Sequence, residues 1–239
     1  MEVIAHRGAS TEALENSFSA FTKAIEAGAT RIELDAHLSA DGMIVIIHDE
    51  DFKRTADSKL LIKDVRLSTF REIRLINGEQ VPLLSQVIER FLPNIELNIE
   101  LKSGGTDLVD AVLKALPPTK NRKNKVIISS FDLELLKYLA SLNTSETIAL
   151  LWEKDENSLL VESMTSCDSK VLHPEARKLD QGLMDIAREN QWLVYPYISL
   201  ENEVDKESLW HKLKSLGING FCTNYPRELS KWLKDPKND

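Results

Sequence analysis

The sequence predicts an α/β fold, specifically a (β/α)8 TIM barrel with a small insertion after a hairpin made by the second strand. Two observations lead to this prediction: apolar runs typical of buried strands recur along the 239 residues, and most of them precede an amphipathic helical pattern. This alternation predicts a parallel sheet, and eight runs favour a closed barrel over an open doubly wound sheet. The runs are Val3–Ala5, Ile32–Leu38, Ile95–Leu101, Val126–Ser129, Thr147–Leu151, Lys170–Leu172, Trp192–Tyr197 and Gly220–Cys222. Helical patterns include Phe18–Ala27, Leu108–Leu116, Leu133–Leu142, Leu183–Asn190 and Leu209–Leu216.

The stretch after the second strand departs from this alternation. Asp41-Gly42 separates Ile32–Leu38 from Met43–His48, and Asp-Gly between two strand-like runs predicts a hairpin. Residues 50–80 then fit no barrel unit, because they are largely polar with one short predicted helix near Leu67–Leu75. We expect them to form an insertion at the barrel mouth, within a single barrel domain that spans residues 1–239.

Composition excludes several classes of protein. The formal net charge of −8 argues against non-specific nucleic-acid binding, which usually needs a basic face. No apolar run approaches the roughly 20 residues of a membrane helix, and a first strand starting at Glu2 leaves no room for a signal peptide. The two cysteines, Cys167 and Cys222, lack a CxxC spacing and are expected to be reduced, buried thiols. These features predict a cytoplasmic protein without integral membrane contact.

Three carboxylates interrupt apolar strand runs. Glu33 and Asp35 are two residues apart, so their side chains share one face of a strand, and Glu100 occupies a similar place on the next barrel strand. Like charges on one inward face repel unless a cation lies between them, and Mg2+ and Ca2+ prefer such oxygen ligands. We therefore predict that these three residues bind one divalent cation, Ca2+ or Mg2+. The alternative is that the acids pair with Arg7 and Lys102 without a metal.

Two histidines and two cations accompany the acids. His6 ends the first strand and His48 ends the hairpin, and imidazole is suited to proton transfer near neutral pH. Arg7 can hold phosphate oxygens with its planar guanidinium, and Lys102 shares a strand face with Glu100. Together these groups suit hydrolysis of a phosphodiester, with His6 and His48 as the acid/base pair and Arg7 and Lys102 binding the phosphate.

Other polar residues are weaker candidates. His37 shares a face with the acids but lies nearer the turn, and His173 ends a strand where it would line the mouth. His211 falls on a helix, where we expect it to face solvent. For Asn16 and Ser17, capping of the first helix explains the residue types at least as well as substrate contact does.

These residues, in this order, resemble the glycerophosphodiester phosphodiesterase family in its cytoplasmic bacterial form. The likeness spans nearly the whole chain. His-Arg-Gly alone would be a weak signal, but the ordered set is specific. The matching segments are Val3–Ser10, Glu15–Ser17, Glu33–Asp35, Asp41-Gly42, His48-Asp49 and Glu100–Lys102, with weaker matches at Ser130–Asp132, Gly217–Gly220 and Thr223–Pro226.

The resemblance implies metal-dependent hydrolysis of small glycerophosphodiesters to an alcohol and sn-glycerol 3-phosphate. It implies the roles already given for His6 and His48, and for the metal-binding acids. Two departures from the family pattern occur: Leu14 stands where a proline is usual, and Val194–Ser199 replaces a Trp-Thr-Val-Asn segment. We expect Tyr197 to replace that tryptophan as an aromatic wall, which affects substrate preference more than the chemistry.

Two alternatives remain at this point. A lysophospholipase D would need a wide apolar mouth, and the polar character of residues 50–80 counts against it. A non-catalytic barrel that binds phosphate ligands would be expected to lack some site residues, whereas all seven are present.

Overall fold

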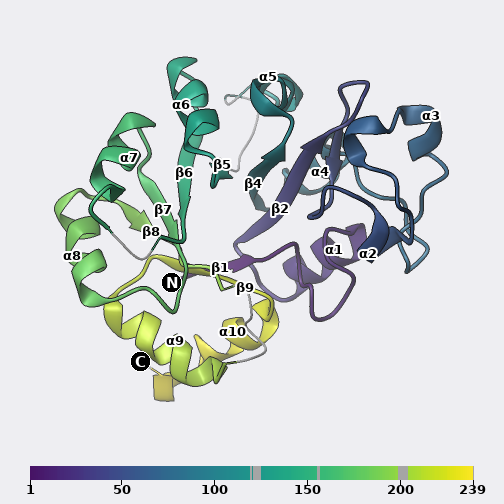
Figure 1. The fold of residues 1–239 in the computed structure, drawn as a ribbon. Helices are drawn as coiled ribbons and strands as arrows, with labels where there is room; N and C mark the ends of the chain where they lie inside the picture. Colours follow the sequence, from purple (N-terminus) through teal and green to yellow (C-terminus); the bar gives the residue numbers. More distant parts are fainter. Residues whose placement is uncertain (119, 121–124, 155–156, 199–203, 239) are drawn as a thin grey trace.

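The chain forms a nearly closed barrel of parallel strands with helices around it (Figure 1), as the sequence predicts. The computed structural model describes residues 1–118, 120, 125–154, 157–198 and 204–238. Neighbouring strands follow the order β8-β7-β6-β5-β4-β2-β1-β9, and an isolated parallel bridge between Tyr197 and Cys222 joins the two ends. The strands are β1 (Glu2–Ala5), β2 (Arg31–Leu38), β3 (Ile44–Ile46), β4 (Glu96–Ser103), β5 (Val126–Ser130), β6 (Thr147–Trp152), β7 (Val171–Pro174), β8 (Leu193–Val194) and β9 (Gly220–Thr223).

Helices alternate with the strands and pack their apolar faces against the outside of the barrel, where the main core lies. Three of them begin directly after an aspartate, Asp132, Asp180 or Asp205, whose carboxylate accepts backbone N–H groups of the first turn. No helix in the described ranges is long and apolar enough to span a membrane. The helices are α1 (Phe18–Glu26), α2 (Lys53–Ala56), α3 (Leu67–Phe70), α4 (Leu84–Phe91), α5 (Gly105–Ala115), α6 (Leu133–Ser141), α7 (Leu160–Ser166), α8 (Gln181–Glu189), α9 (Lys206–Leu216) and α10 (Pro226–Trp232).

The predicted strand over Trp192–Tyr197 is wrong in length, because only Leu193 and Val194 join a continuous ladder. Pro196 has no N–H to donate, which interrupts regular pairing. Tyr197 forms isolated bridges beyond the proline, and its N–H donates to the Pro174 carbonyl at 3.0 Å. Ser199 lies outside the described residues.

The predicted hairpin is confirmed: β3 pairs antiparallel with β2, and the chain turns between Ser39 and Met43. The insertion that follows has a small apolar core of its own and lies beside β2 in Figure 1. The helix predicted over Leu67–Leu75 ends at Phe70 instead. Ile73 and Leu75 are buried on either side of exposed Arg74, an alternation typical of extended backbone, and Arg74 forms an antiparallel bridge with Gln80.

Gly8 allows the loop after β1 to pass close to α1. Its φ is +84°, and a Cβ at this position would lie 2.7 Å from the carbonyl carbon of Ala20. We expect Gly8→Ala to lower the free energy of unfolding by more than about 3 kcal/mol, because it combines backbone strain with a clash against a helix backbone.

Gly42→Ala is the matched control for this effect in denaturant unfolding. Gly42 has a similar φ of +79° but nothing within 4 Å of an added Cβ, so it tests the backbone cost alone, about 1–2 kcal/mol. Equal losses of unfolding free energy in the two variants would show that the contact between residue 8 and α1 does not affect stability.

Candidate active site

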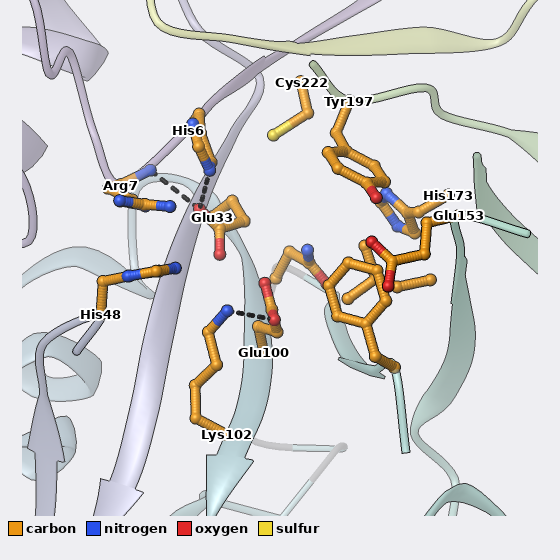
Figure 2. A pocket seen from close by; sticks show the side chains of 13 residues that line it. His6, Arg7, Glu33, His48, Glu100, Lys102, Glu153, His173, Tyr197 and Cys222 are labelled. Atoms are coloured by element: carbon orange, nitrogen blue, oxygen red, sulfur yellow. Dashed lines mark hydrogen bonds and ion pairs between the residues drawn. The ribbon is translucent and has the colours of Figure 1, made fainter. Parts of the chain in front are cut away.

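The candidate site is a pocket at the carboxyl ends of the barrel strands, where the loops that follow the strands meet (Figure 2). Residues from β1, β2, β4, β6, β7 and β9 or directly after them contribute, so the barrel brings distant parts of the chain together. The pocket is lined by His6, Arg7, Glu33, His48, Asn98, Glu100, Lys102, Phe131, Leu151, Glu153, His173, Tyr197 and Cys222. Asp35 is not part of this lining, but it pairs with two of its cations, Arg7 and Lys102.

The three carboxylates predicted as metal ligands lie together. Glu33, Asp35 and Glu100 each offer one oxygen, and these oxygens lie within 4.8 Å of one another. The parallel pairing of β2 with β4 sets this geometry, because it places Asp35 opposite Glu100. All three residues are buried, with exposed fractions of 6% or less.

Burial and mutual repulsion perturb the ionisation of this cluster. Burial, with added repulsion from Asp35, raises the pKa of Glu100 to about 7 and the pKa of Glu33 well above its usual value. Burial acts on Asp35 in the same direction, but the positive charges of Arg7 and Lys102 hold its pKa below the usual range. When all three carboxylates are ionised, they leave one net negative charge after pairing with Arg7 and Lys102.

A divalent cation fits this donor set. The Glu33 Oε1 atom is buried and accepts no hydrogen bond within the described part of the chain, so the cluster contains an oxygen available for coordination. A cation among the three acids would remove their repulsion and change the net charge of the site from negative to positive. An anionic phosphodiester would then be attracted rather than repelled.

Arg7 and Lys102 flank the acids from two sides. The Arg7 Nε lies 3.3 Å from Asp35 Oδ2, and the Lys102 Nζ lies 3.2 Å from Asp35 Oδ1 and also pairs with Glu100. Arg7 has a φ of +55°, and its backbone N–H donates to Glu33 Oε2 at 2.8 Å. This uncommon backbone conformation therefore aims an N–H at a predicted metal ligand.

The loop before α1 also supports the acids. Asn16, with a φ of +52°, donates from Nδ2 to Asp35 Oδ2 at 2.7 Å. Ser17 caps α1 by accepting the Ala20 N–H at 3.1 Å, as its residue type predicts. Asn16 is thus part of the site's support, and Ser17 is a capping residue.

Both predicted catalytic histidines hold Nδ1 in a hydrogen bond. The Nδ1 of His6 lies 2.7 Å from Asn224 Oδ1, and the Nδ1 of His48 lies 2.7 Å from Asp49 Oδ1. Nε2 is therefore the nitrogen that each ring offers to the pocket, and in His6 it lies 4.0 Å from Glu33 Oε2. Burial, with a further effect of Arg7, lowers the pKa of His6 to about 4, so its ring is neutral at physiological pH.

Arg54, from α2 of the insertion, links the partner of His48 to the partner of Arg7. Its guanidinium donates to Asp49 Oδ2 from Nε at 2.7 Å and to both oxygens of Glu15 at 2.8 Å. Glu15 also accepts from Arg7 Nη1 at 2.9 Å. A continuous chain of charge-assisted hydrogen bonds thus runs from His48 through Arg54 to Arg7.

The weaker histidine candidates occupy different places. His37 lies behind the pocket, where Nε2 lies 3.0 Å from the His48 carbonyl and Nδ1 lies 2.6 Å from Ser103 Oγ. His173 does line the pocket, although it is 1% exposed. His211 is exposed on α9 as predicted, with its ring against Trp232.

Several pocket residues were not singled out from the sequence. Asn98 was missed, although the alternation Asn98-x-Glu100-x-Lys102 places it on the same strand face as the acids. Glu153 was also missed, although it directly follows β6 at the end of the barrel where the site lies. Arg54, which supports the site from outside the pocket lining, carries no such signal because it lies on α2 of the insertion. Asn224, the partner of His6, lies within one of the weaker matching segments.

The fold and this site define a (β/α)8-barrel enzyme whose acids, histidines and cations can act on a phosphate ester. The model of the glycerophosphoryl diester phosphodiesterase family matches residues 6–228. A glycerophosphodiester phosphodiesterase of Caldanaerobacter subterraneus is 30% identical over 241 residues, which cover 95% of each chain. The chain therefore belongs to the glycerophosphoryl diester phosphodiesterase family.

Solved structures agree with this assignment. A glycerophosphodiester phosphodiesterase from Thermotoga maritima is 30% identical, with a TM-score of 0.79 over 97% of this chain and 98% of its own. An Oleispira antarctica phosphodiesterase, solved with its product sn-glycerol-3-phosphate, has a TM-score of 0.87 at 24% identity, over 98% of this chain and 97% of its own. At 24% identity, the similarity to the Oleispira antarctica structure supports the fold alone.

Proposed function

We propose that this enzyme hydrolyses small glycerophosphodiesters to an alcohol and sn-glycerol 3-phosphate with the help of one divalent cation. The observation that carries the proposal is the buried cluster of Glu33, Asp35 and Glu100, flanked by two cations and two histidines at the strand ends. A bound Ca2+ or Mg2+ would polarise the phosphoryl oxygens and lower the barrier to nucleophilic attack. The proposal treats the chain as one functional barrel unit, with residues 50–80 as an insertion.

In this proposal, Arg7 and Lys102 hold the phosphate oxygens, and the histidines move protons on opposite sides of it. His6 is the general base, because Asn224 occupies Nδ1 and leaves Nε2 to accept a proton. His48 is the general acid, because the Asp49 carboxylate accepts the Nδ1 hydrogen bond and leaves Nε2 to donate a proton to the leaving alkoxide. The nucleophile is water or the neighbouring glycerol hydroxyl.

The products test this proposal directly. We expect glycerophosphocholine to give sn-glycerol 3-phosphate and choline, as followed by phosphorus NMR and choline detection. Release of phosphocholine and glycerol would contradict it, because the other ester bond would then be the one cleaved. Turnover of lysophosphatidylcholine alone would support a lysophospholipase D instead. The cavity of about 230 Å³ favours the small water-soluble diester, since ligand pockets for larger molecules usually reach several hundred Å³.

We also propose that the enzyme works in the cytoplasm. In support, Cys167 and Cys222 are both buried, and no disulfide joins them in the described part of the chain. Reduced thiols are typical of that compartment.

Arg54 provides a prediction about the support of this site. We expect Arg54→Gln to lower kcat by about tenfold with a smaller change in KM, because it releases Asp49 from its position behind His48. The Arg54 side chain is 47% exposed, so the barrel should still fold. Steady-state kinetics and thermal unfolding measure the two effects.

Arg188→Gln is the matched control, since Arg188 is a half-exposed arginine that pairs with Asp185 on α8, away from the pocket. Arg54→Lys should recover only part of the loss, because an ammonium cannot bridge two carboxylates as a planar guanidinium does. Wild-type kcat in Arg54→Gln would show that this chain of hydrogen bonds does not position His48.

A further inference from the structure

The wall of the pocket opposite the phosphate-binding cations has a different chemistry. Figure 2 shows Arg7, His48 and Lys102 on one side, and Tyr197 and Glu153 on the other. Phe131, which follows β5, also lines this pocket. The proposed mechanism gives no task to Glu153, Phe131 or Tyr197.

The two rings form an aromatic corner at the mouth. Phe131 and Tyr197 pack edge to face, with ring centroids 5.8 Å apart and an interplanar angle of 85°. Phe131 is 42% exposed, so much of its surface is accessible to a ligand in the pocket. Lys102 Nζ lies 6.0 Å from the Phe131 ring, so this single ring adjoins both the phosphate side and the aromatic corner.

Glu153 adds a negative charge beside these rings. It is exposed, and no ion pair to its carboxylate is found in the described part of the chain. Among the residues that the structure describes, two cations lie nearby without pairing with this carboxylate: Lys154 lies over the Trp152 ring, 5.0 Å from its centroid, and Lys178 Nζ donates to the Glu153 backbone carbonyl. Glu153 also acts on Tyr197. Burial raises the pKa of the Tyr197 hydroxyl, and the negative charge of Glu153 raises it further.

The pocket therefore has two walls of different charge preference. One side attracts an anion, and the other combines a carboxylate with aromatic faces, which is the combination that binds ammonium groups through charge pairing and cation–π contact. The Phe131 ring lies 6.0 Å from Lys102 Nζ and packs against Tyr197, so the complementary ligand carries a phosphate and a positive charge a few bonds apart.

We propose that Glu153, Phe131 and Tyr197 form a seat for a cationic alcohol, so that the enzyme prefers diesters of choline or ethanolamine to neutral diesters. This inference rests on the proposed function, since it concerns the alcohol released by the same reaction. The glycerol half, which all these substrates share, then lies outside the seat.

Steady-state kinetics on two substrates test the seat. We expect wild-type kcat/KM to be about tenfold higher for glycerophosphocholine than for glycerophosphoglycerol, in keeping with a cation–π and charge contact at a partly exposed site. Glu153→Gln should remove this preference by raising KM for glycerophosphocholine, with glycerophosphoglycerol changed by less than about twofold. Tyr197→Leu should lower the preference too, whereas Tyr197→Phe, which keeps the ring, should retain it.

Glu189→Gln is the matched control, because it removes an equal charge from an exposed position on α8. Thermal unfolding of each variant shows whether the barrel is intact. Equal wild-type kcat/KM for the two diesters would overturn the proposed seat. An equal loss on both substrates in Glu153→Gln would also overturn it, because it would place the shared glycerol half against this wall. Wild-type protein that hydrolyses neither diester would instead contradict the proposed function itself.

Discussion

His6→Ala is expected to lower kcat for glycerophosphodiester hydrolysis by about 10²- to 10⁴-fold while the barrel stays folded. The reason is that His6 presents Nε2 to the pocket next to Glu33, with Nδ1 fixed by Asn224. Its removal takes away the group proposed to accept the proton of the nucleophile. The measurement is kcat at saturating metal and substrate, together with thermal unfolding.

His48→Ala should give a loss of similar size, because acid and base are both needed in one reaction. The losses should not multiply in the double variant, since the two residues serve the same chemical step. His211→Ala is the control for removal of a histidine, because His211 is exposed on α9, away from the pocket. Full activity in folded His6→Ala would show that the base is a different group.

Glu33→Gln is expected to weaken divalent-cation binding by at least about 100-fold and to lower activity by about 10³-fold. A glutamine amide has nearly the same shape as the carboxylate and can still accept the Arg7 backbone N–H, so the loop geometry should persist. What is lost is the charge that would face a cation alongside Asp35 and Glu100. Titration calorimetry with Ca2+ and Mg2+ measures the affinity.

Although Glu33→Gln is expected to weaken metal binding, it should not lower the stability of the metal-free protein. Burial and the neighbouring acids raise the pKa of Glu33 above its unfolded value. The fold therefore loses stability as the pH rises above the unfolded pKa of this carboxyl, and the loss is complete above the raised pKa. At pH 8, Glu33→Gln should therefore be at least as stable as wild type without metal, whereas Glu189→Gln should change neither property. Wild-type metal affinity in Glu33→Gln would contradict the assignment of the cluster as a metal site.

The sequence predicts the barrel and the centre of the site because both depend on local patterns. Alternating strands and helices specify the fold, and the period of two along β2 places Glu33 and Asp35 on one face. Parallel pairing then brings Glu100 beside them. The Asp41-Gly42 turn likewise predicts the hairpin that carries His48.

The parts that the sequence does not predict depend on loops meeting in space. Arg54 reaches Glu15 across 39 residues, and Asn224 reaches His6 across 218 residues. No periodicity in the sequence encodes either contact. The short helix at Leu67–Phe70 was overestimated for a related reason, since burial of Ile73 and Leu75 in the core of the insertion outweighs helical propensity.

The most direct test of the account is the release of sn-glycerol 3-phosphate from glycerophosphocholine before and after removal of divalent cations. The account predicts release with Ca2+ or Mg2+, loss of release in excess chelator, and recovery when the cation is restored. Undiminished release after exhaustive chelation would contradict a metal bound by Glu33, Asp35 and Glu100, and with it the proposed mechanism.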